Sequence, residues 1–284
     1  MMMAFFRDMS DNPFLITGLL AGLLASVSCG VIGPYVVARR IVFLSGAIAH
    51  IALGGIGAAV FLASAYPESF SWLHPLHGAV VAALSGAVVI GLIHGRAAER
   101  TDTLIGALWA VGMALGILLI KFTPGYQGEL MSYLFGNITS VSRNEVSMVL
   151  VLNFLVLGCM VLYYKRLLAI CLDQQQAELQ GVHLVGTNIL LLSLVALTVI
   201  CLIQIVGLIL VIALLTLPAA TAGHHLNRMA PIMVVSVLLC AVLTTVPRVA
   251  VYGTRISPES AIVLAAGAVY LGSVLVRAVR ARRT

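Results

Sequence analysis

Residues 41–65 read IVFLSGAIAHIALGGIGAAVFLASA, an apolar stretch in which His50 is the one ionisable side chain. As an α-helix that rises about 1.5 Å per residue, the stretch is long enough to cross the roughly 30 Å hydrocarbon core of a bilayer. A helix is required there because a lone strand would leave its backbone N–H and C=O groups unpaired in lipid. The stretch therefore predicts a transmembrane helix.

The rest of the chain repeats this pattern. Of its 284 residues, 61% are hydrophobic and 9% are charged, against about 25% charged in a soluble domain, which excludes a water-soluble globule. The sequence predicts an all-α, polytopic membrane protein with about 8–9 transmembrane helices in a single domain, residues 1–284. The apolar runs lie at 14–36, 41–65, 76–95, 103–120, 144–164, 184–204, 206–226, 230–247 and 259–277.

The sidedness of the chain follows from its basic residues. The segments after alternate runs, starting with the first, carry 11 of the 16 lysines and arginines, and the opposite side carries five. The positive-inside rule then places the C-terminus in the cytoplasm and, with nine crossings, the N-terminus outside. The runs 184–204 and 206–226 have almost no turn between them, and if they form one bent element the N-terminus changes side. The net charge of +6 favours lipid headgroups over nucleic acid as a partner.

Several functional classes are excluded by what the sequence lacks. Its two lysines, Lys121 and Lys165, do not lie in a G-x-x-x-x-G-K-[ST] pattern, so any energy from ATP must come from a partner subunit. The five cysteines form no C-x-x-C pair and are expected to be small packing residues. We expect no covalent chemistry and no permanently bound cofactor.

The polar stretch 173–181, DQQQAELQG, is too short and too hydrophilic to cross the membrane. Asp173 can cap a helix with Gln176 three residues on, and Gly181 can supply the left-handed residue that ends it. A short helix of about two turns, small at Ala177, suits docking in a groove of a cytoplasmic protein. An ordinary capped surface helix has the same spacing.

Around this stretch the sequence resembles the permease subunits of the ABC importers that take up zinc, manganese or iron. In that family an acidic residue, an alanine four positions on and a glycine four further mark the coupling helix, which Asp173, Ala177 and Gly181 match, with Glu178 inside it. Five further pieces occur in the same order: Gly33-Pro34 with Arg39-Arg40; Ile48-Ala49-His50 with Gly54; Asp102-Thr103-Leu104-Ile105-Gly106; Leu130-Met131-Ser132-Tyr133-Leu134-Phe135-Gly136; and Val206-Gly207 leading to Leu217-Pro218-Ala219-Ala220-Thr221-Ala222.

The resemblance implies a type II, cobalamin-permease-like importer fold in a bacterial plasma membrane. It implies a homodimer whose interface forms the pathway, a separate cytoplasmic ATP-binding subunit and an extracellular or periplasmic metal-binding protein. The chain would then be the permease that alternates between outward and inward access, with a divalent metal as cargo.

His50 is the main candidate ligand for that metal. An ionisable group about 13 Å into a membrane helix is costly, and a neutral imidazole is a common zinc ligand. A hydrogen-bonded packing histidine is the alternative interpretation, and the family resemblance favours the ligand. Many family members carry Asp four residues before this histidine, where this chain has Gly46. The loss of an oxygen ligand favours zinc over manganese or iron and leaves the remaining ligands unidentified.

Weaker candidates lie at the two ends of the pathway. His74 and His77, with Glu68, are placed to receive metal outside, and His224 and His225 to release it inside, although solvated loop histidines would look the same. Pro218 removes a backbone hydrogen bond and is a candidate gate hinge, or a simple kink. Residues 129–138 are expected to form a half-inserted helix at the outer mouth.

Two other functions would use the same composition. A proton-driven secondary transporter would use His50 as its titrating group, but the centres of the runs lack the carboxylates of a proton relay. An intramembrane metalloenzyme would need an H-E-x-x-H or a paired-aspartate motif, and no run contains one.

Overall fold

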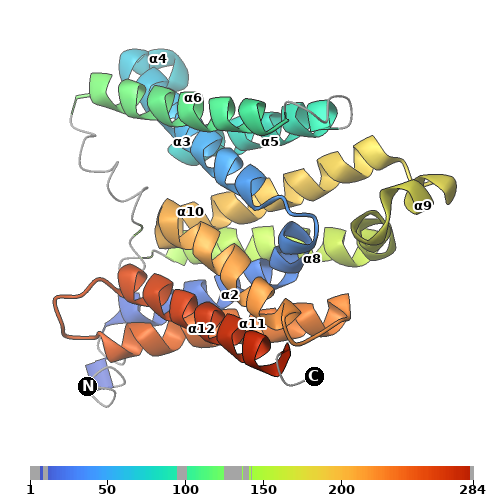
Figure 1. Cartoon of the computed structure of the whole chain (residues 1–284). Helices are drawn as coiled ribbons and strands as arrows, with labels where there is room; N and C mark the ends of the chain where they lie inside the picture. Colours follow the sequence, from blue (N-terminus) through green and yellow to red (C-terminus); the bar gives the residue numbers. More distant parts are fainter. Residues whose placement is uncertain are drawn as a thin grey trace.

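A computed structural model describes residues 7–8, 12–94, 101–124, 136, 141 and 143–281 of the chain. The described part contains nine helices that are long and apolar enough to cross a membrane, in agreement with the nine predicted runs. Figure 1 shows these helices packed into one bundle, with α9 and α4 at opposite ends. The described elements are α2 (Pro13–Ala38), α3 (Val42–Ala65), α4 (Pro67–Phe70), α5 (Pro75–His94), α6 (Thr101–Phe122), α8 (Arg143–Leu172), α9 (Gln174–Leu179), α10 (Leu184–Gly223), α11 (Met229–Ala250) and α12 (Pro258–Ala281).

Glycines let α3 pack closely between α5 and α6. A Cβ atom at Gly54 would lie 2.9 Å from the carbonyl oxygen of Gly112 on α6, and one at Gly57 would lie 2.6 Å from that of Gly116. On the other side of α3, a Cβ at Gly55 would overlap the backbone of Gly78 on α5. Without a hydrophobic driving force between helices in lipid, such backbone contact supplies much of the packing energy. The glycines of α3 therefore allow its backbone to approach both neighbouring helices closely.

The helix α10 is interrupted at Gly207, whose φ of 74° and ψ of 166° are not helical. Asn188, before this break, accepts a hydrogen bond from Arg39 at the end of α2. Leu215 and Ala219, after the break, lie against Gly33. Gly33 is on α2, about two turns before Arg39. Both halves of α10 therefore reach the same end of α2, so the chain doubles back at Gly207, as Figure 1 also shows. The two runs with almost no turn between them are thus two separate crossings.

Two departures from the predicted boundaries concern α8 and residues 129–138. The helix α8 continues to Leu172, well past the predicted end of its apolar run at residue 164. At about 1.5 Å per residue, α8 is longer than the bilayer core, and its last turn leads directly into α9. The predicted half-inserted helix lies outside the described residues except for Gly136, where a Cβ would overlap the backbone of Val206 and Gly207.

Polar contacts hold α2 against its neighbours inside the apolar bundle. Ser28 donates a short hydrogen bond to Asn153 on α8, and the Asn153 amide donates to the carbonyl of Leu24 at 3.1 Å. Ser26 and Thr244 on α11 share a hydrogen bond of 3.2 Å. These four polar side chains each bond to a group on a neighbouring helix, which is the arrangement that lipid favours.

Pro218 lies inside α10, and the carbonyl that it leaves without a helical partner is not unpaired. Proline has no N–H, so the carbonyl four residues earlier, that of Leu214, loses its helical partner. The buried thiol of Cys240 on α11 donates to this carbonyl at 3.4 Å. A neighbouring helix thus completes the hydrogen bonding beside Pro218. Cys240, predicted to be a simple packing residue, also has this bonding role.

Candidate functional site

His50 lies in the middle of α3 and is almost completely buried, with 6% of its surface exposed. Its ring stacks on the indole of Trp109 from α6, with 4.6 Å between the ring centroids and 27° between the planes. Its Nδ1 atom is buried and has no hydrogen-bond partner among the described residues. An unpaired buried nitrogen costs free energy, so it marks a place where a ligand would be stabilising. This agrees better with a ligand than with a hydrogen-bonded packing histidine.

Trp109 occupies the space that a side chain at position 46 would need. A Cβ atom at Gly46 would lie 2.6 Å from Cζ3 and 2.8 Å from Cη2 of the indole. One turn along α3 from His50, the missing side chain is therefore replaced by the aromatic ring that covers the imidazole. A hollow of about 440 Å³ opens beside this ring, lined by Phe43, Ile105, Gly106 and Trp109. Trp109 could not be predicted from the sequence, because only the contact between α3 and α6 brings it beside Gly46.

No group of three or more His, Cys, Asp and Glu side chains in the described part of the chain is close enough to hold one metal ion. His50 is therefore a single nitrogen donor within that part of one protomer. A metal ion held there would need its other ligands from water or from a second copy of the chain.

His74 and His77 lie together at the start of α5, near the α4 end of the bundle. Nδ1 of His77 accepts a hydrogen bond from the backbone N–H of His74 at 3.2 Å, and the two rings are 6.3 Å apart between centroids. His77 also lies against Trp72, at 6.2 Å between centroids. One nitrogen of His77 is thus used to fix the turn before α5. Glu68 is in the neighbouring short helix α4.

His224 and His225 meet on the hydroxyl of Ser273 from α12. Nδ1 of His224 lies 2.9 Å and Nε2 of His225 lies 3.0 Å from Ser273 Oγ. Because one hydroxyl has a single proton, Ser273 can donate to only one ring and must accept from the other. Burial, then the nearby Arg277 and His225, lower the pKa of His224, which favours its neutral form. The structure thus brings His224 and His225 together, and the group between them is the hydroxyl of Ser273.

The polar stretch 173–181 forms the helix that its sequence predicts. Asp173 caps α9 by accepting from the N–H groups of Gln175 at 2.8 Å and Gln176 at 3.2 Å. Gly181 has a φ of 79°, the left-handed conformation predicted for the residue that ends the helix. Ala177 faces inward and is 2% exposed, whereas Leu179 is 89% exposed. Any partner of this helix would therefore contact Leu179 and the polar side chains.

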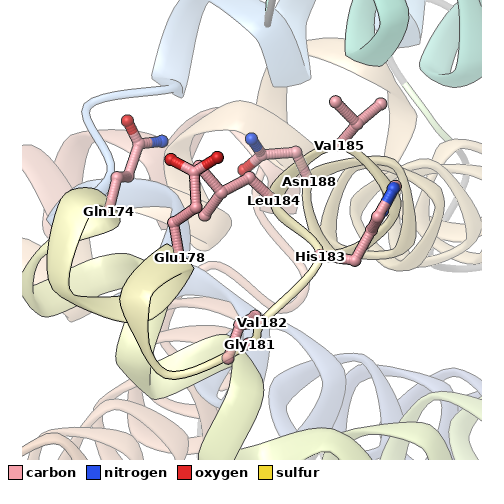
Figure 2. Close-up of a pocket in the computed structure, with 8 residues that line it drawn as sticks. All are labelled: Gln174, Glu178, Gly181, Val182, His183, Leu184, Val185 and Asn188. Carbon is pink, nitrogen blue, oxygen red and sulfur yellow. The ribbon is translucent and has the colours of Figure 1, made fainter.

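Two hollows flank α9. The larger, of about 590 Å³, lies between α9 and the start of α10, and Figure 2 shows Gln174, Glu178, His183 and Asn188 around it. The smaller, of about 220 Å³, lies between α9 and the end of α8 and is lined by residues that include Lys165 and Gln176. The helix therefore stands as a ridge between two grooves, a shape suited to insertion into another protein.

Comparison with known proteins gives concordant matches over nearly the whole chain. The sequence profile described as "ABC 3 transport family" matches residues 11–277. An uncharacterized membrane protein of Synechocystis sp. is 39% identical over 264 residues, which cover 93% of this chain and 91% of that protein. A "Probable metal transport system membrane protein" of Chlamydia pneumoniae is 41% identical over 239 residues, 84% of this chain and 80% of that protein.

More distant relatives extend these matches to a named metal and to a solved structure. A manganese transport system membrane protein, MntC, of Halalkalibacterium halodurans is 30% identical over 242 residues, 85% of this chain and 80% of that protein. The structure of PsaBC from Streptococcus pneumoniae in complex with Fab contains a chain with a TM-score of 0.84 and 27% identity, covering 96% of this chain and 95% of that chain. The fold is therefore shared over nearly the whole of this chain and of the solved chain.

Proposed function

Because the chain belongs to the ABC 3 transport family, we propose that it is the membrane-spanning permease of an ATP-driven importer that takes up a divalent metal ion. The names of the chlamydial and Halalkalibacterium relatives support metal as the cargo. One observation carries the coupling to ATP: α9 is a capped helix that projects beyond the spans, in a chain whose sequence has no P-loop. ATP hydrolysis then belongs to a separate subunit that binds α9.

In this proposal the α9 end of the bundle faces the cytoplasm and the α4 end faces outward. The excess of basic residues on the α9 side supports this orientation. Asp173, Ala177, Glu178 and Gly181 form the coupling helix, with Asp173, Ala177 and Gly181 shaping it and Glu178 facing the larger hollow. A metal-binding protein delivers the ion near His74 and His77, and the ion leaves near His224 and His225 beyond the Pro218 kink. Two copies of the chain alternate together between outward and inward access.

His50 is the proposed ligand within the membrane, and its unpaired Nδ1 is the atom that supports this role. We propose zinc as the preferred ion because imidazole nitrogen suits zinc, whereas manganese favours oxygen ligands. The position one turn earlier provides no oxygen ligand, since Gly46 has no side chain and Trp109 fills its space. The manganese system that MntC belongs to makes manganese the competing cargo to be measured.

Reconstitution tests the proposal. The permease, its ATPase and its binding protein are placed in liposomes, and uptake of zinc, manganese and iron is measured with and without ATP. We expect ATP-dependent uptake with zinc preferred, and a fall of about tenfold or more in His50→Ala, in line with the loss of a metal ligand. The matched control is Ser45→Ala, which removes a buried polar group from the same helix away from the imidazole.

Each part of the proposal has its own contrary result. Uptake that proceeds without ATP, or that follows a proton gradient instead, contradicts the ABC mechanism. Equal uptake by wild type and His50→Ala contradicts the ligand assignment while leaving the mechanism intact. A preference for manganese overturns the choice of zinc alone.

A further inference from the structure

The guanidinium of Arg39 connects four helices at the α9 end of the bundle. Arg39 is the C-cap residue of α2. Its Nη1 donates to the carbonyl of Ile170, in the last turn of α8, at 2.8 Å, and its Nη2 donates to Oδ1 of Asn188 on α10 at 2.9 Å. The amide of Gln174, the first residue of α9, lies against the same group. With its oxygen turned toward Arg39, it accepts from Nη1 at 2.7 Å.

These bonds hold the four helix ends in one arrangement. The last carbonyls of a helix lack intrahelical partners, so the bond to Ile170 satisfies one that α8 leaves open. Asn188 is buried, with 7% of its surface exposed, and would lose an acceptor contact if Arg39 were removed. The rigid planar fork of arginine reaches several acceptors at once, which the point charge of lysine cannot do.

The helix α2 connects this cluster to the half of α10 that follows Gly207. Gly33 precedes Arg39 by six residues, which is about 9 Å along the helix. There the backbone of α2 touches α10 so closely that a Cβ on Gly33 would overlap the carbonyl oxygen of Leu215. Leu215 lies three residues before Pro218, in the half of α10 that follows the break at Gly207. A displacement of α2 along or across its axis must therefore displace the segment that contains Pro218.

We propose that Arg39 is the positioning residue through which movement of α9 reaches the Pro218 segment, by way of α2. The proposal rests on the proposed coupling of α9 to an ATPase. When the ATPase displaces α9, the guanidinium moves with Gln174 and carries α2 with it, and the contact at Gly33 shifts the half of α10 that contains Pro218. The path consists of contiguous hydrogen bonds and one rigid helix, which is the physical connection that long-range coupling needs.

The test measures how much metal is transported per ATP hydrolysed. Wild type, Arg39→Ala, Arg39→Lys, Asn188→Ala and the control Arg40→Ala are compared in liposomes as complexes with the ATPase and binding protein. Arg40 is exposed and adjacent in sequence, so it matches Arg39 in charge and position. We expect Arg39→Ala to keep its ATPase bound and hydrolysing while metal moved per ATP falls at least fivefold. Arg39→Lys should be intermediate, and Arg40→Ala should be unchanged.

The contrary outcomes are distinct. If uptake and hydrolysis fall together in Arg39→Ala, so that the ratio is unchanged, Arg39 only stabilises the helix ends and the inference is wrong. If Arg39→Ala releases the ATPase, the residue builds the docking surface and the inference is also wrong. If Arg39→Ala does not accumulate, Asn188→Ala decides, with a lowered ratio expected. A wild-type complex without ATP-dependent uptake contradicts the proposed function itself.

Discussion

At the residue scale, the surroundings of His50 decide what this histidine can bind. One face of the imidazole is covered by Trp109, so a metal ion must approach in the plane of the ring, along a nitrogen lone pair. Metal-bound histidines usually donate their second N–H to an oxygen, and His50 Nδ1 has no such partner among the described residues. Protein atoms also enclose Nδ1, so an ion could bind this nitrogen only after neighbouring side chains move apart.

Gly46 and Trp109 are expected to be coupled in stability. Gly46→Ala places a Cβ 2.6 Å from the indole and should lower the free energy of unfolding by about 1–3 kcal/mol. Trp109→Leu should remove the clash. Gly46→Ala should therefore cost little stability when it is added to Trp109→Leu. Thermal unfolding in detergent measures the cycle. The control Gly106→Ala, on α6 with open space at its Cβ, should change little. Additive losses in the double variant would contradict the coupling.

The two histidines at Ser273 predict a pH dependence at this end of the bundle. Burial, then Arg277 and His225, lower the pKa of His224 from its ordinary value of 6.5. As pH falls through 6.5, the unfolded chain therefore binds more protons at this residue than the folded chain does. The contribution of His224 to stability is fully present above that pH and is lost below it. Between about pH 7.5 and about pH 5.5, the unfolding midpoint should fall further in wild type than in His224→Gln.

The control for this effect is His74→Gln, a histidine outside the Ser273 pair that should keep the wild-type pH response. The size of the effect is limited, because His224 is only partly buried. An equal pH response in wild type and His224→Gln would show that another group is responsible.

At the element scale, the sequence predicts what depends on local composition and misses what depends on contacts between distant segments. The nine spans and the capped helix α9 follow from apolar length, from Asp173 and from Gly181. The extension of α8 to Leu172 was missed because Lys165 and Arg166 end the apolar run without ending the helix. Two contacts could not be predicted because they join distant segments and leave no local pattern in the sequence. They are the stacking of Trp109 on His50 and the bonds of Arg39 to its neighbouring helices.

The thiol of Cys240 should stabilise α10 beside Pro218. Cys240→Ala removes the donor to the Leu214 carbonyl that Pro218 leaves open, so it should cost about 1–3 kcal/mol of unfolding free energy. Cys240→Ser keeps a donor at the same place and should recover most of that loss. The measurement is thermal unfolding in detergent, with Cys159→Ala, at a half-buried site, as the control. If Cys240→Ser is no more stable than Cys240→Ala, packing alone explains the residue.

At the scale of the whole molecule, function requires that the two ends of the bundle face different compartments. The grooves beside α9 and the Arg39 cluster lie at one end, and the short helix α4 lies at the other (Figure 1). Between them, α2 contacts both halves of α10 and also α8 and α11. A force applied at α9 therefore has a packed route into the half of α10 that contains Pro218.

Cysteine labelling tests the orientation on which this scheme depends. Leu179 on α9 is 89% exposed, and Ser71, which caps the end of α4, is also exposed, so a cysteine at either place is accessible to a maleimide that does not cross membranes. With α9 in the cytoplasm, Ser71→Cys should be labelled in intact cells or spheroplasts. Leu179→Cys should be labelled only after the membrane is permeabilised. The native cysteines are buried or half-buried, and the unmodified chain serves as the background control. The reverse pattern would place α9 outside, where no ATP-hydrolysing subunit could reach it, and would contradict the proposed mechanism at its first step.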